Sequence, residues 1–174
     1  MNTKRIIVQN PGGDSMGSTI KSLINTLQSW YSNHNIIVDL SNVNFVHPAL
    51  ILPLSAIISE VKTKEYKVTT VLNQHIQSYL SSVYFPDGLN VNANPSWKET
   101  FRQLDTKNYM PICKIPAQIN DTTIREQLLS TFETILIKQL ALTGQIITVL
   151  KYLISESIDN IVDHSESHNG WIMV

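Results

Sequence analysis

The first half of the chain alternates short β-branched segments with segments of helical spacing, and this alternation limits the folds open to it. Extended segments are expected at 5–9, 36–40 and 66–72. Residues 15–32 place a row of apolar side chains on one side of a predicted helix: Ile20, Leu23, Ile24, Leu27 and Trp30. Pro48 favours the start of a second helix that runs from Leu50 to Thr63. Strands that alternate with helices in this way predict an α/β fold.

The second half begins with a segment, 90–116, whose turn-like composition is typical of a connector with partial structure. A helix is expected over 123–142, and Gly144 is placed to end it in a left-handed conformation. The next helix has apolar residues at helical spacing: Ile147, Leu150, Ile154, Ile158 and Ile161. An apolar strand is predicted at 171–174. We therefore expect a helical hairpin followed by a strand, although any dimerisation hairpin would have the same pattern.

Three polar residues recur at every fourth position of the last helix: Glu156, Asn160 and His164. At 100° per residue they fall within a sector of about 80°, beside the apolar row. A carboxylate, an amide and an imidazole are thus aligned where the apolar face meets water. The pattern has two interpretations, a solvated helix flank on which polar residues coincide or one wall of a binding site.

The spacing Glu156-x-x-x-Asn160-x-x-x-His164, followed by a strand that Gly170 precedes, resembles the N-box of the GHKL ATPases. That family includes histidine kinases, anti-sigma-factor kinases, gyrase and Hsp90. The resemblance implies that Asn160 holds a magnesium ion that bridges the phosphates of ATP. It also implies that Glu156 polarises the attacking water or hydroxyl and that His164 lies nearer the phosphates. Mg²⁺ prefers oxygen ligands and retains several waters, so one amide oxygen together with phosphate oxygens is chemically sufficient.

The family pattern is incomplete in this chain. GHKL ATPases also carry an Asp-x-Gly-x-Gly segment that reads adenine and a glycine-rich lid, whereas the six glycines here form neither, and four residues follow Gly170. We therefore expect residues 116–174 to be the opening part of a truncated GHKL α/β sandwich. A longer form is expected to bind ATP and Mg and to act as an ATPase or a serine-kinase-like protein. The 174-residue chain alone is expected to be inactive and to bind ATP weakly or not at all.

The segment Val38-Asp39-Leu40-Ser41, followed by Val43 and Phe45 and then a helix, resembles the STAS domain of anti-anti-sigma factors. The resemblance implies a mixed sheet with helices over residues 1–115 and a helix N-terminus that docks against a protein partner. In that family a serine in the segment after the phenylalanine is phosphorylated by a GHKL kinase. Here 46–50 contains no hydroxyl, and Pro48 stands at the phosphoacceptor position. A phosphorylation switch at that position is therefore not expected.

Composition narrows the function classes further. A formal charge of −1 argues against a nucleic-acid partner or an anionic membrane, and no apolar run has membrane-spanning length. No signal peptide is recognised at the first residues. The single cysteine, Cys113, excludes an intrachain disulfide and fits a reducing, cytoplasmic compartment. We interpret Cys113 as a small buried hydrophobe rather than a nucleophile.

Two further patterns favour structural interpretations. The glycine-rich segment 12–19 resembles a phosphate loop but has Ser18 where that motif needs lysine, so a turn with a helix cap is expected. The remaining histidines share no ligand-like spacing with cysteine or carboxylate clusters. The sequence thus favours a regulatory signalling protein with a STAS-like module and a partial ATP-binding module. The alternative is a non-catalytic module whose 123–164 helical pair buries its apolar face in a protein partner or a second copy.

Overall fold

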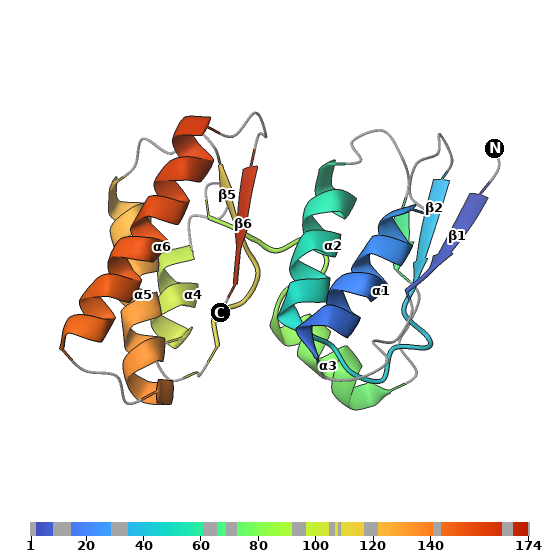
Figure 1. Ribbon diagram of the computed structural model, residues 1–174, viewed down its shortest axis with the longest axis horizontal. Helices are drawn as coiled ribbons and strands as arrows, with labels where there is room; N and C mark the ends of the chain where they lie inside the picture. Colours follow the sequence, from blue (N-terminus) through green and yellow to red (C-terminus); the bar gives the residue numbers. More distant parts are fainter. Residues whose placement is uncertain are drawn as a thin grey trace. The chain divides into compact units, whose positions relative to one another are not determined.

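The computed structural model shows a mixed α/β protein (Figure 1). It describes residues 3–8, 15–28, 35–60, 66–68, 73–91, 97–104, 107, 109–116, 122–140, 144–164 and 169–173. The chain forms two compact units, Met1–Asp87 and Gly88–Val174. Each unit has its own three-stranded sheet, and each is described separately below.

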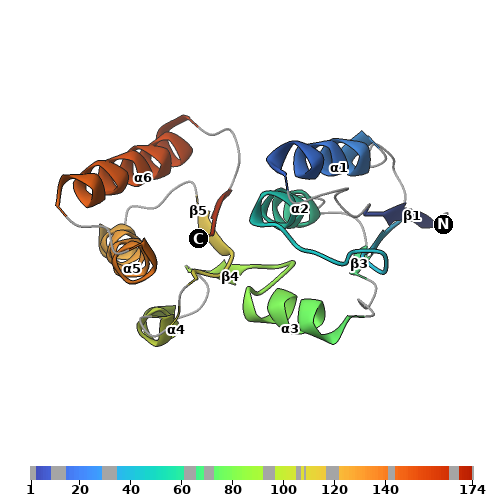
Figure 2. The ribbon, with the colours of Figure 1, turned by 60° about the horizontal axis from the view of Figure 1, so that its bottom comes forward.

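The first unit is built on a parallel sheet in the order β1-β2-β3. Its strands are β1 (Thr3–Ile7), β2 (Asn35–Asp39) and β3 (Tyr66–Val68), and its helices are α1 (Met16–Gln28), α2 (Pro48–Glu60) and α3 (Gln74–Ser82). Figure 2 shows α1 and α2 on one side of this sheet and α3 on the other. The alternation of strands and helices confirms the α/β prediction. The STAS resemblance implies a mixed sheet, whereas the described strands here are all parallel.

The core of the first unit follows the two-residue period of its strands. Alternate residues of the first two strands and of the segment after β1 are buried, namely Ile6, Val8, Ile36 and Val38, and α2 covers them with Leu50, Ile51, Leu54 and Ile58. Val43, in the loop after β2, is buried as well. This packing explains why the β-branched segments become strands, and α2 begins at Pro48 as predicted.

A buried carboxylate connects the first two strands. Asp39 accepts a hydrogen bond from Nε of Arg5 at 2.6 Å, and its other oxygen accepts one from the backbone N–H of Ser41 at 2.9 Å. Asp39 is almost fully buried, whereas Arg5 keeps most of its side chain in solvent. The carboxylate is tolerated there because both of its oxygens are hydrogen-bonded.

Helix α1 forms as predicted, but its most buried face is not its most apolar one. Of the apolar row, Leu23 and Leu27 are half-buried, Ile20 and Ile24 are 46% and 48% exposed, and Trp30 lies outside the described residues. The fully buried residues are Thr19, Ser22 and Thr26. The physical reason is that the hydroxyls of Thr19 and Thr26 donate to backbone carbonyls one turn earlier, at 3.3 and 2.8 Å, so small side chains can be buried without orphaned donors.

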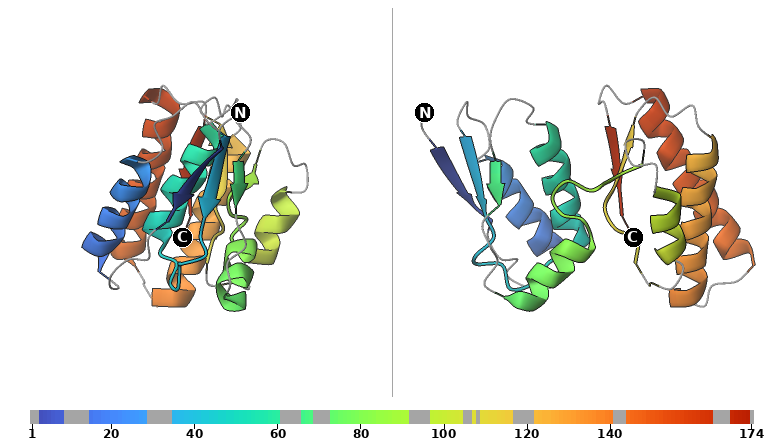
Figure 3. Two further views of the ribbon diagram at one scale, coloured as in Figure 1. Left: turned by 90° about the vertical axis from the view of Figure 1, so that its right-hand side faces the viewer. Right: turned by 180° about the vertical axis from the view of Figure 1, so that it is seen from behind.

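The second unit is a sheet covered by three helices. Its elements are β4 (Leu89–Asn90), α4 (Trp97–Leu104), β5 (Cys113–Pro116), α5 (Thr122–Leu140), α6 (Gln145–His164) and β6 (Asn169–Ile172). The strand order is β4-β5-β6, with β4 and β5 parallel and β5 and β6 antiparallel. Figures 1 and 3 show α4, α5 and α6 on the same side of this sheet. The predicted hairpin and strand are confirmed, and Gly144 has the expected positive φ of 64°.

The division between the units falls between Asp87 and Gly88, whereas the sequence places its module boundary between 115 and 116. Residues 90–116 do more than connect the units. Val91, Phe101 and Cys113 belong to the same buried cluster as Leu128 and Phe132 of α5. The described part of this segment thus contributes α4 and β5 to the core of the second unit.

Among the described residues, no helix is both long enough and apolar enough to cross a membrane.

Gly170 of β6 lies opposite Ile115 of β5 and directly against α6. A Cβ at this position would overlap Cγ2 of Ile161 and come within 2.9 Å of its Cδ1. Cγ2 of a β-branched side chain cannot move without changing χ1, so the helix or the strand would have to shift. The absence of a side chain at residue 170 is therefore what allows α6 to pack on β6.

We predict that Gly170→Ala lowers the free energy of unfolding by about 1–3 kcal/mol because of this overlap. Urea denaturation followed by circular dichroism measures the change. Gly17→Ala is the matched control, since a Cβ in α1 at that position meets nothing within 4 Å. It should raise stability by about 0.4–1 kcal/mol, as expected for alanine in place of glycine at a compatible site. Equal effects of the two substitutions would contradict the packing argument.

Candidate functional site

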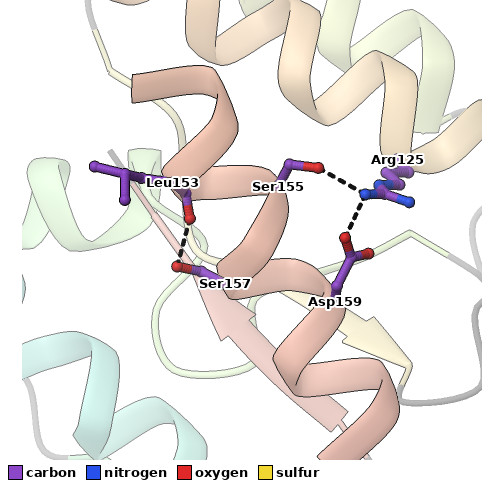
Figure 4. A network of polar contacts seen from close by, with 5 residues as sticks. All are labelled: Arg125, Leu153, Ser155, Ser157 and Asp159. Carbon is purple, nitrogen blue, oxygen red and sulfur yellow. Dashed lines mark hydrogen bonds and ion pairs between the residues drawn. The ribbon is translucent and has the colours of Figure 1, made fainter. Parts of the chain in front are cut away.

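Polar contacts join one side of α6 to α5. Nη2 of Arg125 donates to Oγ of Ser155 at 2.6 Å and to Oδ2 of Asp159 at 2.5 Å (Figure 4). Nζ of Lys151 donates to Glu133 at 2.7 Å two turns further along the helix pair. The side chains of both ion pairs, Arg125–Asp159 and Lys151–Glu133, are only partly exposed, and the two pairs lie along one side of α6. Rotation of α6 about its axis would break all of them.

The opposite flank of α6 carries two of the predicted site residues. Ile147 and Ile158 face the core, as the apolar row predicts, and Glu156 and Asn160 are exposed. Within the described part of the chain, neither Glu156 nor Asn160 has a hydrogen-bond or ion-pair partner. His164 is the last residue of α6, and its side chain lies outside what the structure describes. The structure thus places a carboxylate and an amide one turn apart on a solvent-facing surface.

The same surface holds an apolar patch that the sequence reasoning missed. We call Ile146, Val149, Tyr152 and Leu153 the α6 outer patch; each of these residues is more than half exposed. At 100° per residue, Val149 and Leu153 lie on the same sector as Glu156 and Asn160, one to two turns closer to the helix start. The spacing of Ile146, Val149 and Leu153 was the available signal, because it forms a second apolar row next to the buried one.

The donor set on α6 fits magnesium held jointly with phosphates. The amide oxygen of Asn160 and the carboxylate of Glu156 are hard oxygen donors, which Mg²⁺ prefers. The described residues contain no group of three or more His, Cys, Asp or Glu side chains placed to hold a metal ion. A magnesium ion at Asn160 would therefore take most of its remaining ligands from phosphate and water, as the N-box resemblance implies.

The loop after β2 shows how the helix that follows it begins. The backbone N–H of Ala49 donates to Nδ1 of His47 at 3.1 Å, so this histidine caps α2 immediately before Pro48. The ring of Phe45 lies 6.4 Å from that of His47, tilted by 59°. The glycine-rich segment 12–14 lies outside the described residues. The predicted helix cap is confirmed at Ser15, whose Oγ accepts from the backbone N–H of Ser18 at 3.2 Å.

Cys113 is fully buried in β5, and its Sγ lies 3.4 Å from the carbonyl oxygen of Pro111. Burial raises the pKa of the Cys113 thiol far above its ordinary value, because a thiolate would lose its solvation there. This confirms the interpretation of Cys113 as a small core residue rather than a nucleophile.

Comparisons of the chain with protein-family models, with curated proteins and with solved structures gave no match.

We predict that Cys113 of the folded protein does not react with a thiol reagent such as 5,5′-dithiobis(2-nitrobenzoate) at pH 8. The raised pKa keeps the group protonated, and burial blocks access. The measurement is the release of thionitrobenzoate, and the control is the same protein in 6 M guanidinium chloride, about the strength that unfolds most domains. One equivalent should be released only after unfolding. Rapid reaction of the folded protein would show that β5 is accessible.

Proposed function

We propose that the chain is part of a regulatory signalling protein whose second unit contributes to a GHKL-like site for Mg-ATP. The observation that carries the proposal is the joint exposure of Glu156 and Asn160, one turn apart, on the flank of α6 that α5 does not use. A ligand could reach both side chains without disturbing the core. The proposal follows the N-box resemblance for the roles of these residues.

The helix that carries these residues contacts two neighbours. The ion pairs Arg125–Asp159 and Lys151–Glu133 join α6 to α5, and Gly170 lets β6 approach Ile161 of α6. Side chains on a helix held in this way keep their relative positions better than side chains on loops, which favours a binding site. The order of strand, helical hairpin and antiparallel strand agrees with the beginning of a GHKL module.

The chemistry assigned to each residue is limited to what its own atoms supply. The amide oxygen of Asn160 would hold the magnesium ion that accompanies the nucleotide, with His164 nearer the phosphates. The carboxylate of Glu156 would accept a hydrogen bond from the attacking water or serine hydroxyl and orient it. Mg-ATP supplies the phosphoryl group. Since the adenine-reading segment of the family is missing from the sequence, the site in this chain provides only the phosphate side.

The remaining assignments belong to the same proposal. The STAS-like resemblance spans β2, α2 and β3 of the first unit, and it suits a regulatory module that docks with a protein partner in the cytoplasm. The module ranges of 1–115 and 116–174 follow the two resemblances, whereas the two compact units of the structure meet at Asp87.

We predict that Asn160→Ala weakens Mg-ATP binding by at least about 10- to 100-fold, the loss seen when outer partners of a metal site are removed. Isothermal titration calorimetry should be run on the 174-residue chain and on the longest native product of its reading frame. Stability should hardly change, because Asn160 is exposed. Ser157→Ala is the matched control, since Ser157 is exposed on the same helix and donates to the carbonyl of Leu153, one turn earlier (Figure 4).

Binding by the longer product alone would agree with the proposal, and so would its loss in Asn160→Ala. Glu156→Gln should retain binding and lose turnover. The proposal would fail if neither protein bound Mg-ATP, or if Asn160→Ala bound it as tightly as the unchanged sequence.

The α6 outer patch favours a second candidate function, a non-catalytic interaction module. Four adjacent large apolar side chains in water are unusual on a monomer, and their burial against another surface gives about 25 cal/mol for each Å² removed from water. The helical pair α5–α6 would then pack against a second copy through this patch.

We predict that, if this second function holds, the chain self-associates and Leu153→Lys shifts it towards the monomer by about tenfold or more in dissociation constant, since a charge replaces a buried anchor. Sedimentation velocity over a range of concentrations measures the shift. Thr148→Lys is the control, because Thr148 is also exposed on α6 but is not apolar. A monomer at every concentration would exclude self-association through the patch.

A further inference from the structure

The first unit contains a pocket of about 330 Å³ that lies outside the site on α6. Asn44, Phe45 and Val46 of the β2–α2 loop form one wall, and His75, Ile76 and Tyr79 of α3 form the other. The loop leaves the sheet at the carboxyl end of β2.

Both walls are held in place by hydrogen bonds. The ring of Phe45 is tilted against His47, which is fixed by its bond to the backbone of Ala49. On the other side, Oδ1 of Asn73 accepts from the backbone N–H groups of His75 and Ile76 at 2.9 and 3.4 Å and so fixes the start of α3. The pocket is therefore formed before any ligand arrives, which lowers the entropic cost of binding.

The lining indicates what kind of ligand fits. Three of the six lining residues, Phe45, His75 and Tyr79, carry rings, and Ile76 is buried and supplies an aliphatic surface. None of the six is Asp, Glu, Lys or Arg. A ring in this environment gains offset or edge-to-face contacts, and no lining residue supplies a fixed countercharge for an ion.

The volume of the pocket sets a second limit on the ligand. Ligand pockets commonly span about 300–1,000 Å³, so this pocket is near the lower end and suits one ring system rather than a nucleotide. Phe45 is 47% exposed, which leaves a large part of its ring available to a ligand. The imidazole of His75 is exposed and can donate or accept a hydrogen bond.

We propose that this pocket binds an uncharged small molecule with a single aromatic ring system and one hydrogen-bonding substituent, such as a phenol or an indole. The ring lies between Phe45 and Tyr79 above Ile76, and the substituent is directed towards His75. This binding site is separate from the nucleotide site proposed on α6, and neither depends on the other.

The test uses the 174-residue chain labelled with ¹⁵N and titrated with phenol, toluene, indole and cyclohexanol. Cyclohexanol has the hydroxyl and ring size of phenol without the aromatic system. We expect saturable shifts from phenol and indole at the amides of residues 44–46 and 75–79, with at least about fivefold weaker binding of cyclohexanol. Phe45→Leu should weaken phenol binding by about two- to tenfold, and His75→Ala should weaken phenol more than toluene.

Tyr152→Leu is the matched control, because it removes an exposed aromatic side chain from the second unit and should leave the dissociation constants unchanged. Both pocket variants alter exposed positions, so their spectra should retain the dispersion of the folded protein. The proposal is overturned if no saturable shift is seen, if cyclohexanol binds as well as phenol, or if Phe45→Leu has no effect. Tighter binding of N-acetyltyrosinamide than of phenol would also overturn it, because the pocket would then be a peptide site.

Discussion

The second unit depends on the burial of one face of α6. Ile147 and Ile158 lie on that face, and their burial decides which sides of α6 meet the core and water. A single nitrogen, Nη2 of Arg125, donates from α5 to both Ser155 and Asp159 on the neighbouring flank of α6. An ion pair of this exposure adds little to stability, so the contact agrees with the rotation of the helix rather than setting it. The exposure of Glu156 and Asn160 follows from the position of the buried face.

The sequence predicted the parts of the fold in which hydrophobic period and burial agree. On α6 the row that contains Ile147 and Ile158 is the buried face, and on β1 and β2 the alternate apolar residues are the core. Turn chemistry was equally readable at Gly144 and at Pro48, because positive φ and a fixed φ are each strongly tied to one residue type. Local rules were sufficient in these places because the tertiary structure does not oppose them.

The prediction was incomplete where burial depends on distant partners. Helix α1 buries Thr19, Ser22 and Thr26, and the hydroxyls of Thr19 and Thr26 bond to their own helix, a property that hydropathy does not register. Phe101 looked like part of a connector because its core partners, Leu128 and Phe132, are more than twenty residues away in the chain. The spacing of the candidate site and its place at the edge of the apolar face were predicted. The contact of Arg125 with Ser155, thirty residues later, was not, because spacing within one helix does not show its neighbours.

The buried hydroxyl row of α1 has a consequence for how that helix is held. The hydroxyls of Thr19 and Thr26 donate to their own backbone, so these small side chains present only shallow ridges to the neighbouring surface. About 130° around the same helix, at 100° per residue, Met16, Ile20 and Ile24 form a row with far more surface to bury. Helix α1 therefore has two faces that could form a contact surface. One is buried and has small side chains, and the other is exposed and has larger apolar side chains. The rotation of α1 about its own axis is therefore set by the neighbouring elements more than by the composition of the helix.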